Sequence, residues 1–299
     1  DQAAMEPIVA SPKVYQYRSR MDLKLLRIRS GDMFMGFSPV QGRRVVEVDS
    51  CPIAMEAILR FLPELRRQAM EKMPVKYRNA NLTVKAGSDG RVLWGGIGRR
   101  SLRLAPEDYL WLELGGKRIF YSMETFFQAN LSILPRLIET ILNFEYLDAQ
   151  TVFLDLYGGV GLFGVSMADS AQRVVLIEEN VHSVRCARRT LEFNGIRNME
   201  VVEGRMEETF AALSARIDPE GTVAMIDPPR AGLGRTVSEM LSRGSPFKAL
   251  LYLSCNPQTL ISDLQTILGP GAYKVRTVIP FDFFPRTRHL ETLAVLTPR

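Results

Sequence analysis

The chain has 299 residues, of which 46% are hydrophobic and 24% charged, a balance typical of globular proteins with one large domain or two smaller ones. No apolar run approaches the roughly 20 residues of a membrane-spanning helix, and the first residues lack a secretory signal, so we expect a cytoplasmic protein without a membrane partner. Three cysteines, Cys51, Cys186 and Cys255, are too few and too far apart for a disulfide framework.

Positive charge is concentrated in the first third of the chain. Residues 13–104 contain 19 Lys and Arg against 8 Asp and Glu, whereas the net charge of the whole chain is only +5. This asymmetry indicates that one part of the molecule faces a polyanion, with a solvated basic surface as the alternative. The arginines concerned include Arg18, Arg20, Arg43, Arg44, Arg99, Arg100 and Arg103.

The N-terminal part is predicted to be a tail or linker over residues 1–12, followed by a basic, mixed β-rich domain over residues 13–122. A single helix is expected at about 53–72, and Pro63 should kink it or start a new turn. Gly115-Gly116 supplies the positive φ angles that a tight hairpin turn requires. The predicted strands are 25–29, 33–37, 44–48, 82–85 and 91–94, and the hairpin covers 109–121.

Residues 123–299 are predicted to form an α/β domain. A loop over 123–130 and an amphipathic helix over 131–146 lead into alternating strands and helices, which predicts a Rossmann-like, mainly parallel sheet. Only the loop 280–290 joins the last two strands, so the last strand should be antiparallel. The predicted strands are 152–156, 174–177, 200–202, 223–226, 250–253, 274–279 and 292–296, and helices follow Gly161, Asn180, Met206, Gly234 and Asn256.

A nucleotide site is indicated where the first of these strands ends, in Asp155-Leu-Tyr-Gly-Gly-Val-Gly161. Glycines there let backbone N–H groups approach a ligand, and Glu178, at the end of the second strand, suits hydrogen bonding to a ribose. The spacing is not G-x-G-x-x-G, and no basic residue is placed for a pyrophosphate. The pattern therefore favours S-adenosylmethionine over NAD, with a nicotinamide-dependent oxidoreductase as an alternative class.

Cys255 follows a predicted strand and precedes a predicted helix, in Leu251-Tyr-Leu-Ser-Cys-Asn-Pro257. Ligands bind at this edge of open α/β sheets, and a helix N-terminus favours the thiolate, so Cys255 is a candidate nucleophile; a small buried residue is the alternative. Another strand ends in Asp227-Pro-Pro-Arg230, which predicts a rigid, extended loop. Asp227 can accept hydrogen bonds from a ligand, and Arg230 can hold the loop or a phosphate.

Five segments resemble, in order, the motifs of the RNA 5-methyluridine methyltransferases. Within this family, the resemblance is strongest to the 23S ribosomal RNA uracil-C5 methyltransferases. The resemblance runs from about residue 11 to the C-terminus. It implies that Cys255 is the nucleophile that adds to uracil C6 and that Glu291, expected as an exposed acid at a strand end, is the base that removes the C5 proton. The segments are Phe126-Phe-Gln-Ala-Asn130, Asp155-Leu-Tyr-Gly-Gly-Val-Gly161, Asp227-Pro-Pro-Arg-Ala-Gly232, Ser254-Cys-Asn-Pro257 and His289-Leu-Glu-Thr292.

The resemblance also implies the ligands. The partner would be structured RNA with a flipped uridine, bound through the basic domain and Arg230 by a monomeric enzyme. The context of Cys51 favours ribosomal over transfer RNA, and a non-catalytic RNA-binding homologue is the alternative. The residues placed around S-adenosylmethionine are Gln128, Tyr157, Gly159, Leu162, Glu178 and Asp227.

The chain departs from the family pattern near its start. It lacks the N-terminal β-barrel and the cysteine cluster that holds an iron–sulfur centre in some ribosomal-RNA members. Cys51, in Asp49-Ser-Cys-Pro-Ile53, resembles the downstream cysteine of that cluster. The hypothesis is a truncated homologue in which Cys51 is a leftover ligand, so that a cluster would exist only in a longer native protein. His182 and His289 are isolated, and no metal site is predicted.

Overall fold

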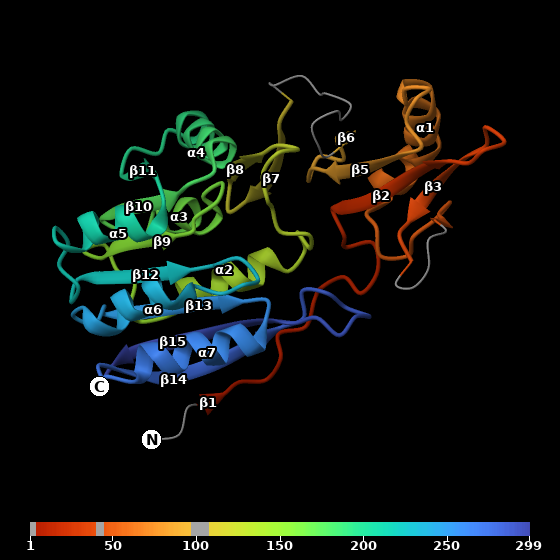
Figure 1. Ribbon diagram of the computed structural model, residues 1–299. Helices are drawn as coiled ribbons and strands as arrows, with labels where there is room; N and C mark the ends of the chain where they lie inside the picture. The colour runs from red at the N-terminus through yellow and green to blue at the C-terminus, as the bar shows by residue number, and fades with distance from the viewer. Residues whose placement is uncertain (1–3, 40–44, 97–107) are drawn as a thin grey trace.

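The computed structural model describes residues 4–39, 45–96 and 108–299 (Figure 1). The described chain forms a larger lobe around an eight-stranded sheet and a smaller lobe around a five-stranded sheet. A two-stranded hairpin lies against the larger lobe. None of the helices in these ranges has the length and apolar character required to cross a membrane.

The larger sheet has the strand order β1-β14-β15-β13-β12-β9-β10-β11. Strand β15 runs antiparallel to both neighbours, and all other pairs are parallel. The predicted fold class, a mainly parallel sheet with an antiparallel last strand, is therefore confirmed. The strands are β1 (Ala4–Met5), β9 (Val152–Leu156), β10 (Arg173–Glu178), β11 (Met199–Glu203), β12 (Thr222–Ile226), β13 (Ala249–Ser254), β14 (Tyr273–Phe281) and β15 (Glu291–Pro298).

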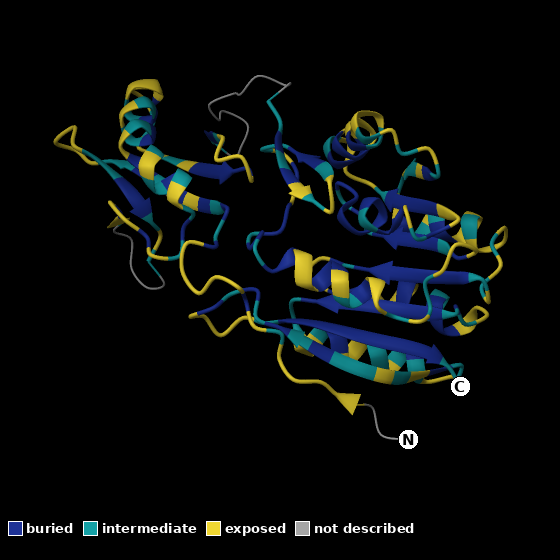
Figure 2. Cartoon of the chain, turned by 180° about the vertical axis from the view of Figure 1, so that it is seen from behind, coloured by how far each residue is buried: buried dark blue, intermediate teal, exposed yellow. Residues whose placement is uncertain are grey.

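Helices cover both faces of this sheet. One face packs against α2 (Leu134–Leu142), α3 (Leu162–Met167) and α4 (Val181–Asn194). The other face packs against α5 (Met206–Ser214), α6 (Gly234–Arg243) and α7 (Pro257–Leu268). The central strands are therefore buried on both sides, as the continuous apolar runs of parallel strands require, and they are dark blue in Figure 2.

The smaller lobe is an antiparallel sheet of order β4-β3-β2-β5-β6 that packs against helix α1 (Glu56–Lys72). Pro63 lies inside α1, which continues past it, so no new helix starts there, and the kink expected at this residue stays a prediction. Of the strand predicted over residues 44–48, the described part forms a strand only at Val46–Glu47. The strands are β2 (Arg20–Arg27), β3 (Met33–Phe37), β4 (Val46–Glu47), β5 (Asn79–Ala86) and β6 (Val92–Gly96).

The predicted hairpin is present as β7 (Leu110–Leu114) and β8 (Lys117–Tyr121). Gly115 and Gly116 form its turn with φ angles of 57° and 75°, which side chains other than glycine rarely adopt. The hairpin packs against α4, where the backbone N–H of Phe120 donates to the Thr190 hydroxyl at 3.0 Å.

The segment predicted as a tail or linker extends the larger sheet over its described residues. Strand β1 pairs in parallel with β14, which makes it the edge strand. Farther along, the Val9 N–H donates to the Pro280 carbonyl at 2.8 Å, and the Asp282 N–H donates to the Val9 carbonyl at 3.0 Å. The pairing is made by backbone groups and needs no alternating hydrophobic side chains, so it could not be predicted from the sequence.

Candidate active site

The candidate site lies at the edge of the larger sheet where the parallel strands end. In Figure 1 this edge faces the smaller lobe. Cys255 directly follows β13, and Glu291 is the first residue of β15. Ser254 pairs with Thr292 in the antiparallel register of these two strands, so the register continues outward to Cys255 opposite Glu291. Two residues far apart in the sequence thus meet at one point of the sheet.

Glu291 is buried, with only 4% of its surface exposed, whereas the sequence had suggested an exposed acid at a strand end. Burial and the nearby Asp227 carboxylate raise the pKa of Glu291 to about 8, and the Arg230 guanidinium opposes this rise. Glu291 is buried because β15 is inserted between β13 and β14 rather than lying at the sheet edge.

Cys255 is half-buried at the N-terminal end of α7. Burial and the Glu291 carboxylate raise the pKa of the Cys255 thiol, and the Arg230 guanidinium lowers it. The expectation that the helix N-terminus would favour the thiolate is therefore wrong for the ligand-free protein. Burial and the facing carboxylate act against the thiolate, and at the helix end the Asn256 side chain accepts the Gln258 N–H at 3.1 Å.

The loop that follows β12 brings a second group of predicted residues together. The Gln128 side-chain amide donates to the Asp227 carboxylate at 3.1 Å, although the two residues are 99 positions apart in the sequence. Burial raises the pKa of Asp227 to about 7, and this hydrogen bond opposes the shift. Arg230, also on this loop, is exposed and lies close enough to Cys255 to affect the thiol pKa.

The glycine-rich turn after β9 is held by Glu178. One oxygen of this carboxylate accepts the Gly159 N–H at 2.9 Å, and the other accepts the Asn180 N–H at 2.7 Å. Tyr157 has a φ of 60°, an uncommon value for a residue with a side chain, and Leu162 is the buried first residue of α3. These predicted residues therefore lie around one turn, at the edge where the parallel strands end.

Asp155 is a residue to which the sequence reading gave no role. It is 1% exposed, and one carboxylate oxygen accepts the Gly164 N–H at 2.7 Å. The other oxygen has no hydrogen-bond partner among the described residues. Burial, together with the charges of Asp227 and Glu178, raises the pKa of Asp155 to about 8. Its place directly before the glycine-rich turn was the signal that could have identified it.

The remaining cysteines and histidines lie elsewhere. Cys51 is 8% exposed in the core of the smaller lobe, and Cys186 is buried in α4. The His182 ring lies 2.9 Å from the Glu124 carboxylate. Among the residues that the structure describes, no group of three His, Cys, Asp or Glu could hold a metal ion. The iron–sulfur hypothesis for Cys51 stays a hypothesis about a longer protein.

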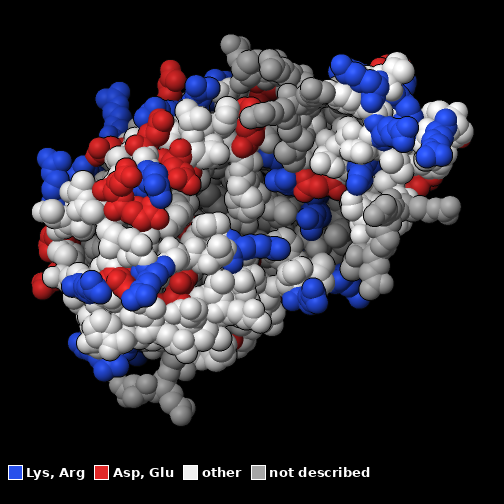
Figure 3. Space-filling model, viewed as in Figure 1, with Lys and Arg blue, Asp and Glu red and all other residues white. Residues whose placement is uncertain are grey.

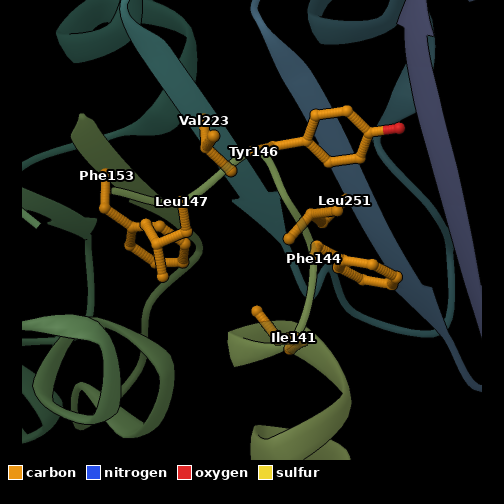
Figure 4. Close-up of a pocket in the computed structure, with 7 residues that line it drawn as sticks. All are labelled: Ile141, Phe144, Tyr146, Leu147, Phe153, Val223 and Leu251. Carbon is orange, nitrogen blue, oxygen red and sulfur yellow. The ribbon is translucent and has the colours of Figure 1, made fainter. Parts of the chain in front are cut away.

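A small apolar pocket lies away from the candidate site, between the α2 region and the sheet (Figure 4). Phe153 and Val223 lie near the start of their strands, at the opposite end from Cys255 and Asp227. The gap is too small for a ligand and reflects packing of the core. It is lined by Ile141, Phe144, Tyr146, Leu147, Phe153, Val223 and Leu251.

Charge is distributed unevenly over the face shown in Figure 3. Lys and Arg side chains gather over the smaller lobe, whereas Asp and Glu gather over part of the larger one. Arg18 and Arg20 lie at the start of the smaller lobe, and Arg20 pairs with Asp22 at 2.9 Å. Arg43, Arg44, Arg99, Arg100 and Arg103, which the charge argument also used, lie outside the described residues.

The chain is similar to known RNA methyltransferases. A family model described as tRNA (uracil-5-)-methyltransferase matches residues 104–299. An uncharacterized RNA methyltransferase of Thermosynechococcus vestitus is 27% identical over 98% of this chain and 74% of its own length. The tRNA (uracil(54)-C(5))-methyltransferase of Schizosaccharomyces pombe is 27% identical over 98% of this chain and 56% of its own length.

Two further proteins complete the comparison. The 23S rRNA (uracil(1939)-C(5))-methyltransferase of Vibrio cholerae is 26% identical over 99% of this chain and 72% of its own length. The crystal structure of a Pyrococcus abyssi tRNA (uracil-54, C5)-methyltransferase in complex with S-adenosyl-L-homocysteine superposes with a TM-score of 0.71. It is 21% identical and covers 99% of this chain and 79% of its own, which shows a shared fold.

Proposed function

Because the chain belongs to the tRNA (uracil-5-)-methyltransferase family, we propose that it acts as a monomer to transfer a methyl group from S-adenosylmethionine to C5 of a uridine in structured RNA. The observation that carries this proposal is the β13–β15 register, which sets Cys255 opposite Glu291 beside the Asp227 loop. Residues 13–122 bind the RNA phosphates, and residues 123–299 carry the chemistry.

The carboxyl groups at the sheet edge fit the cofactor. S-adenosylmethionine carries positive charge on its sulfonium and amino groups and has two ribose hydroxyls. Asp155 has a buried oxygen without a hydrogen-bond partner among the described residues, and Glu178 is fixed by two backbone N–H groups with lone pairs left for a ribose. Gln128, Tyr157, Gly159, Leu162 and Asp227 complete the proposed cofactor site. When bound, the cofactor would supply a methyl group on an electron-poor sulfur, which would keep the bonding electron pair as the methyl group leaves.

Cys255 and Glu291 divide the remaining chemistry between them. The Cys255 thiolate adds to uracil C6, and the electrons of the C5–C6 double bond move onto the ring as an enolate, which makes C5 nucleophilic. C5 then takes the methyl group. Glu291 removes the proton left on C5, the Sγ–C6 bond breaks, and the double bond forms again. The Arg230 guanidinium favours the thiolate and contacts the substrate.

The target uridine must leave its stack to reach both groups, because neither can approach C5 and C6 inside a helix. Relatives whose names specify tRNA and ribosomal RNA match at nearly equal identity, 27% and 26%. The context of Cys51 favours ribosomal RNA, and transfer RNA is the alternative, so both substrates belong in the test.

The test uses ribosomal and transfer RNA fragments that carry 5-fluorouridine, mixed with the protein and S-adenosylmethionine. Fluorine cannot leave C5 as a cation, so elimination stalls and a protein–RNA adduct persists in denaturant. We expect the adduct with wild-type protein and with the control Cys186→Ala, whose cysteine is buried in α4. Cys255→Ala should form none.

The position of the trapped nucleotide would identify the substrate. An adduct that persists in Cys255→Ala would refute the assigned nucleophile. Binding of RNA and cofactor by the wild-type protein, without an adduct or methyl transfer, would support the non-catalytic alternative.

A further inference from the structure

Asp263, on the second turn of α7, is buried and receives hydrogen bonds from three different elements. Its Oδ2 accepts the Tyr252 hydroxyl at 2.6 Å and the Leu233 backbone N–H at 2.8 Å. Its Oδ1 accepts the Ser238 hydroxyl at 3.3 Å. Tyr252 belongs to β13, Leu233 ends the loop after β12, and Ser238 belongs to α6. One carboxylate therefore joins these elements to α7.

The joined elements are those that carry the proposed chemistry. Strand β13 ends directly before Cys255, and the loop that ends at Leu233 carries Asp227 and Arg230. A second contact ties the same loop to α7, because the Asn256 side-chain amide donates to the Arg230 carbonyl at 3.3 Å. Asn256 and Asp263 are seven residues apart, which places them on the same face of the helix.

The loop is shaped to meet this carboxylate. Gly232 has a φ of 82°, and a Cβ added there would lie 2.5 Å from the Asp263 Oδ2 atom. Only glycine lets the backbone pass so close to Asp263 while it makes this turn. The close approach allows the Leu233 N–H to reach the carboxylate, so the turn and the anchor depend on each other.

Resting on the proposed function, we propose that Asp263 is a positioning residue that holds the 227–233 loop against α7 and so keeps the Arg230 guanidinium beside Cys255. Asp263 is hydrogen-bonded to Tyr252 and to the loop backbone at Leu233, which connect it to Cys255 and Arg230 along the chain. It acts through Arg230, whose charge stabilises the thiolate, and through β13, whose end sets the position of the sulfur.

The test measures alkylation of Cys255 by iodoacetamide, which needs neither RNA nor cofactor. Modification is followed by peptide mass, so that Cys255 is read separately from the buried Cys51 and Cys186. At pH 7.5, Arg230→Gln should slow alkylation about tenfold, the change that a rise of one unit in thiol pKa produces. In the Asp263→Asn background, Arg230→Gln should have no further effect, because the guanidinium no longer lies beside the thiol.

An Arg230→Gln effect of equal size in both backgrounds would overturn the proposal and leave Asp263 a purely structural residue. If Asp263→Asn does not fold, Tyr252→Phe replaces it, since this substitution removes one hydrogen-bond donor and keeps the carboxylate. In the Tyr252→Phe background, the effect of Arg230→Gln on the alkylation rate should be at least threefold smaller. An unchanged effect would count against the proposal. Since alkylation requires no substrate, failure of methyl transfer leaves this result intact. In an active protein, Asp263→Asn should lower kcat.

Discussion

Asp155, Asp227 and Glu291 share one environment at the candidate site, since burial raises the pKa of each, to about 8, 7 and 8. Their pKa values in the unfolded chain lie near 4. The folded, ligand-free protein therefore holds protons that the unfolded chain releases. The stability these groups contribute is fully present below about pH 4 and is lost as pH rises through 7 to 8. A cationic ligand that favours the ionised carboxylates would release those protons on binding.

Glu291→Gln tests the proposed base at this scale. The amide preserves the shape of the side chain but cannot take the C5 proton, so we expect methyl transfer to fall by a factor of about 10² or more. A covalent complex with RNA that contains ordinary uridine should accumulate instead. In the wild-type protein, the rate should rise between pH 6 and 8, because Glu291 must be ionised to act as a base and its pKa is about 8.

The control for this substitution is Glu139→Gln, which removes an exposed carboxylate on α2. It should leave both the rate and the pH profile unchanged. Full turnover of Glu291→Gln, without an accumulated complex, would assign the base to another group.

The turn between β9 and α3 packs tightly against the neighbouring strand β10. A Cβ added at Gly158 would lie 2.5 Å from the Cγ atom of Leu176 on β10. The glycine is therefore needed because the two parallel strands pack closely where they end. The sequence predicts that the backbone at Gly158 approaches a ligand. The structure adds a second reason for a glycine at this position, which is the close packing against Leu176.

Gly158→Ala should lower the free energy of unfolding by about 1–3 kcal/mol, because the new methyl group must displace Leu176. In a Leu176→Ala background, where space is available, the cost should be smaller, and the two substitutions should not be additive. Urea unfolding of the four proteins measures this coupling. Gly244→Ala, where φ is −74° and the nearest contact is 3.4 Å, should change stability by no more than about 0.5 kcal/mol. Additive costs would show that Leu176 is not the obstacle.

In the molecule as a whole, the segment 122–132 is held between the two lobes. Lys85 of β5, 2% exposed, donates to the carbonyls of Ser122, Met123 and Thr125 at 2.8, 3.2 and 2.6 Å. The Ser19 N–H donates to the Ala129 carbonyl at 2.7 Å. The smaller lobe therefore anchors the segment that carries Gln128, and the candidate cofactor site depends on both lobes.

Lys85→Met should destabilise the protein by about 2–4 kcal/mol, because three carbonyl groups lose a buried donor. It should also weaken S-adenosylmethionine binding, since the segment that holds Gln128 is no longer anchored. Urea unfolding and calorimetric titration with the cofactor check the two effects. Lys76→Met, at an exposed position, is the matched control and should change neither. Unchanged cofactor binding in Lys85→Met would show that the anchor serves stability alone.

The sequence by itself determined the family, the fold class and most of the strands of the larger sheet. Continuous apolar runs such as 223–226 and 250–253 have one stable place, the buried centre of a parallel sheet, so local pattern and tertiary environment agree. The five motifs, from Phe126 to Thr292, identified the family because they are highly specific together and in this order, although singly only Asp227-Pro-Pro-Arg230 and Ser254-Cys-Asn-Pro257 are strong. The roles assigned to Cys255, Glu291 and the cofactor residues stay predictions.

Only the tertiary structure decided the protonation of the site and the contacts between distant segments. Glu291 is buried because β15 is inserted beside β13, and that strand order cannot be read from a strand's own residues. The pairing of β1 with β14, the Gln128–Asp227 hydrogen bond and the Asp263 anchor likewise join segments far apart in the chain. Burial and the charges of neighbours set a pKa, and both are properties of the folded assembly of segments rather than of any one of them.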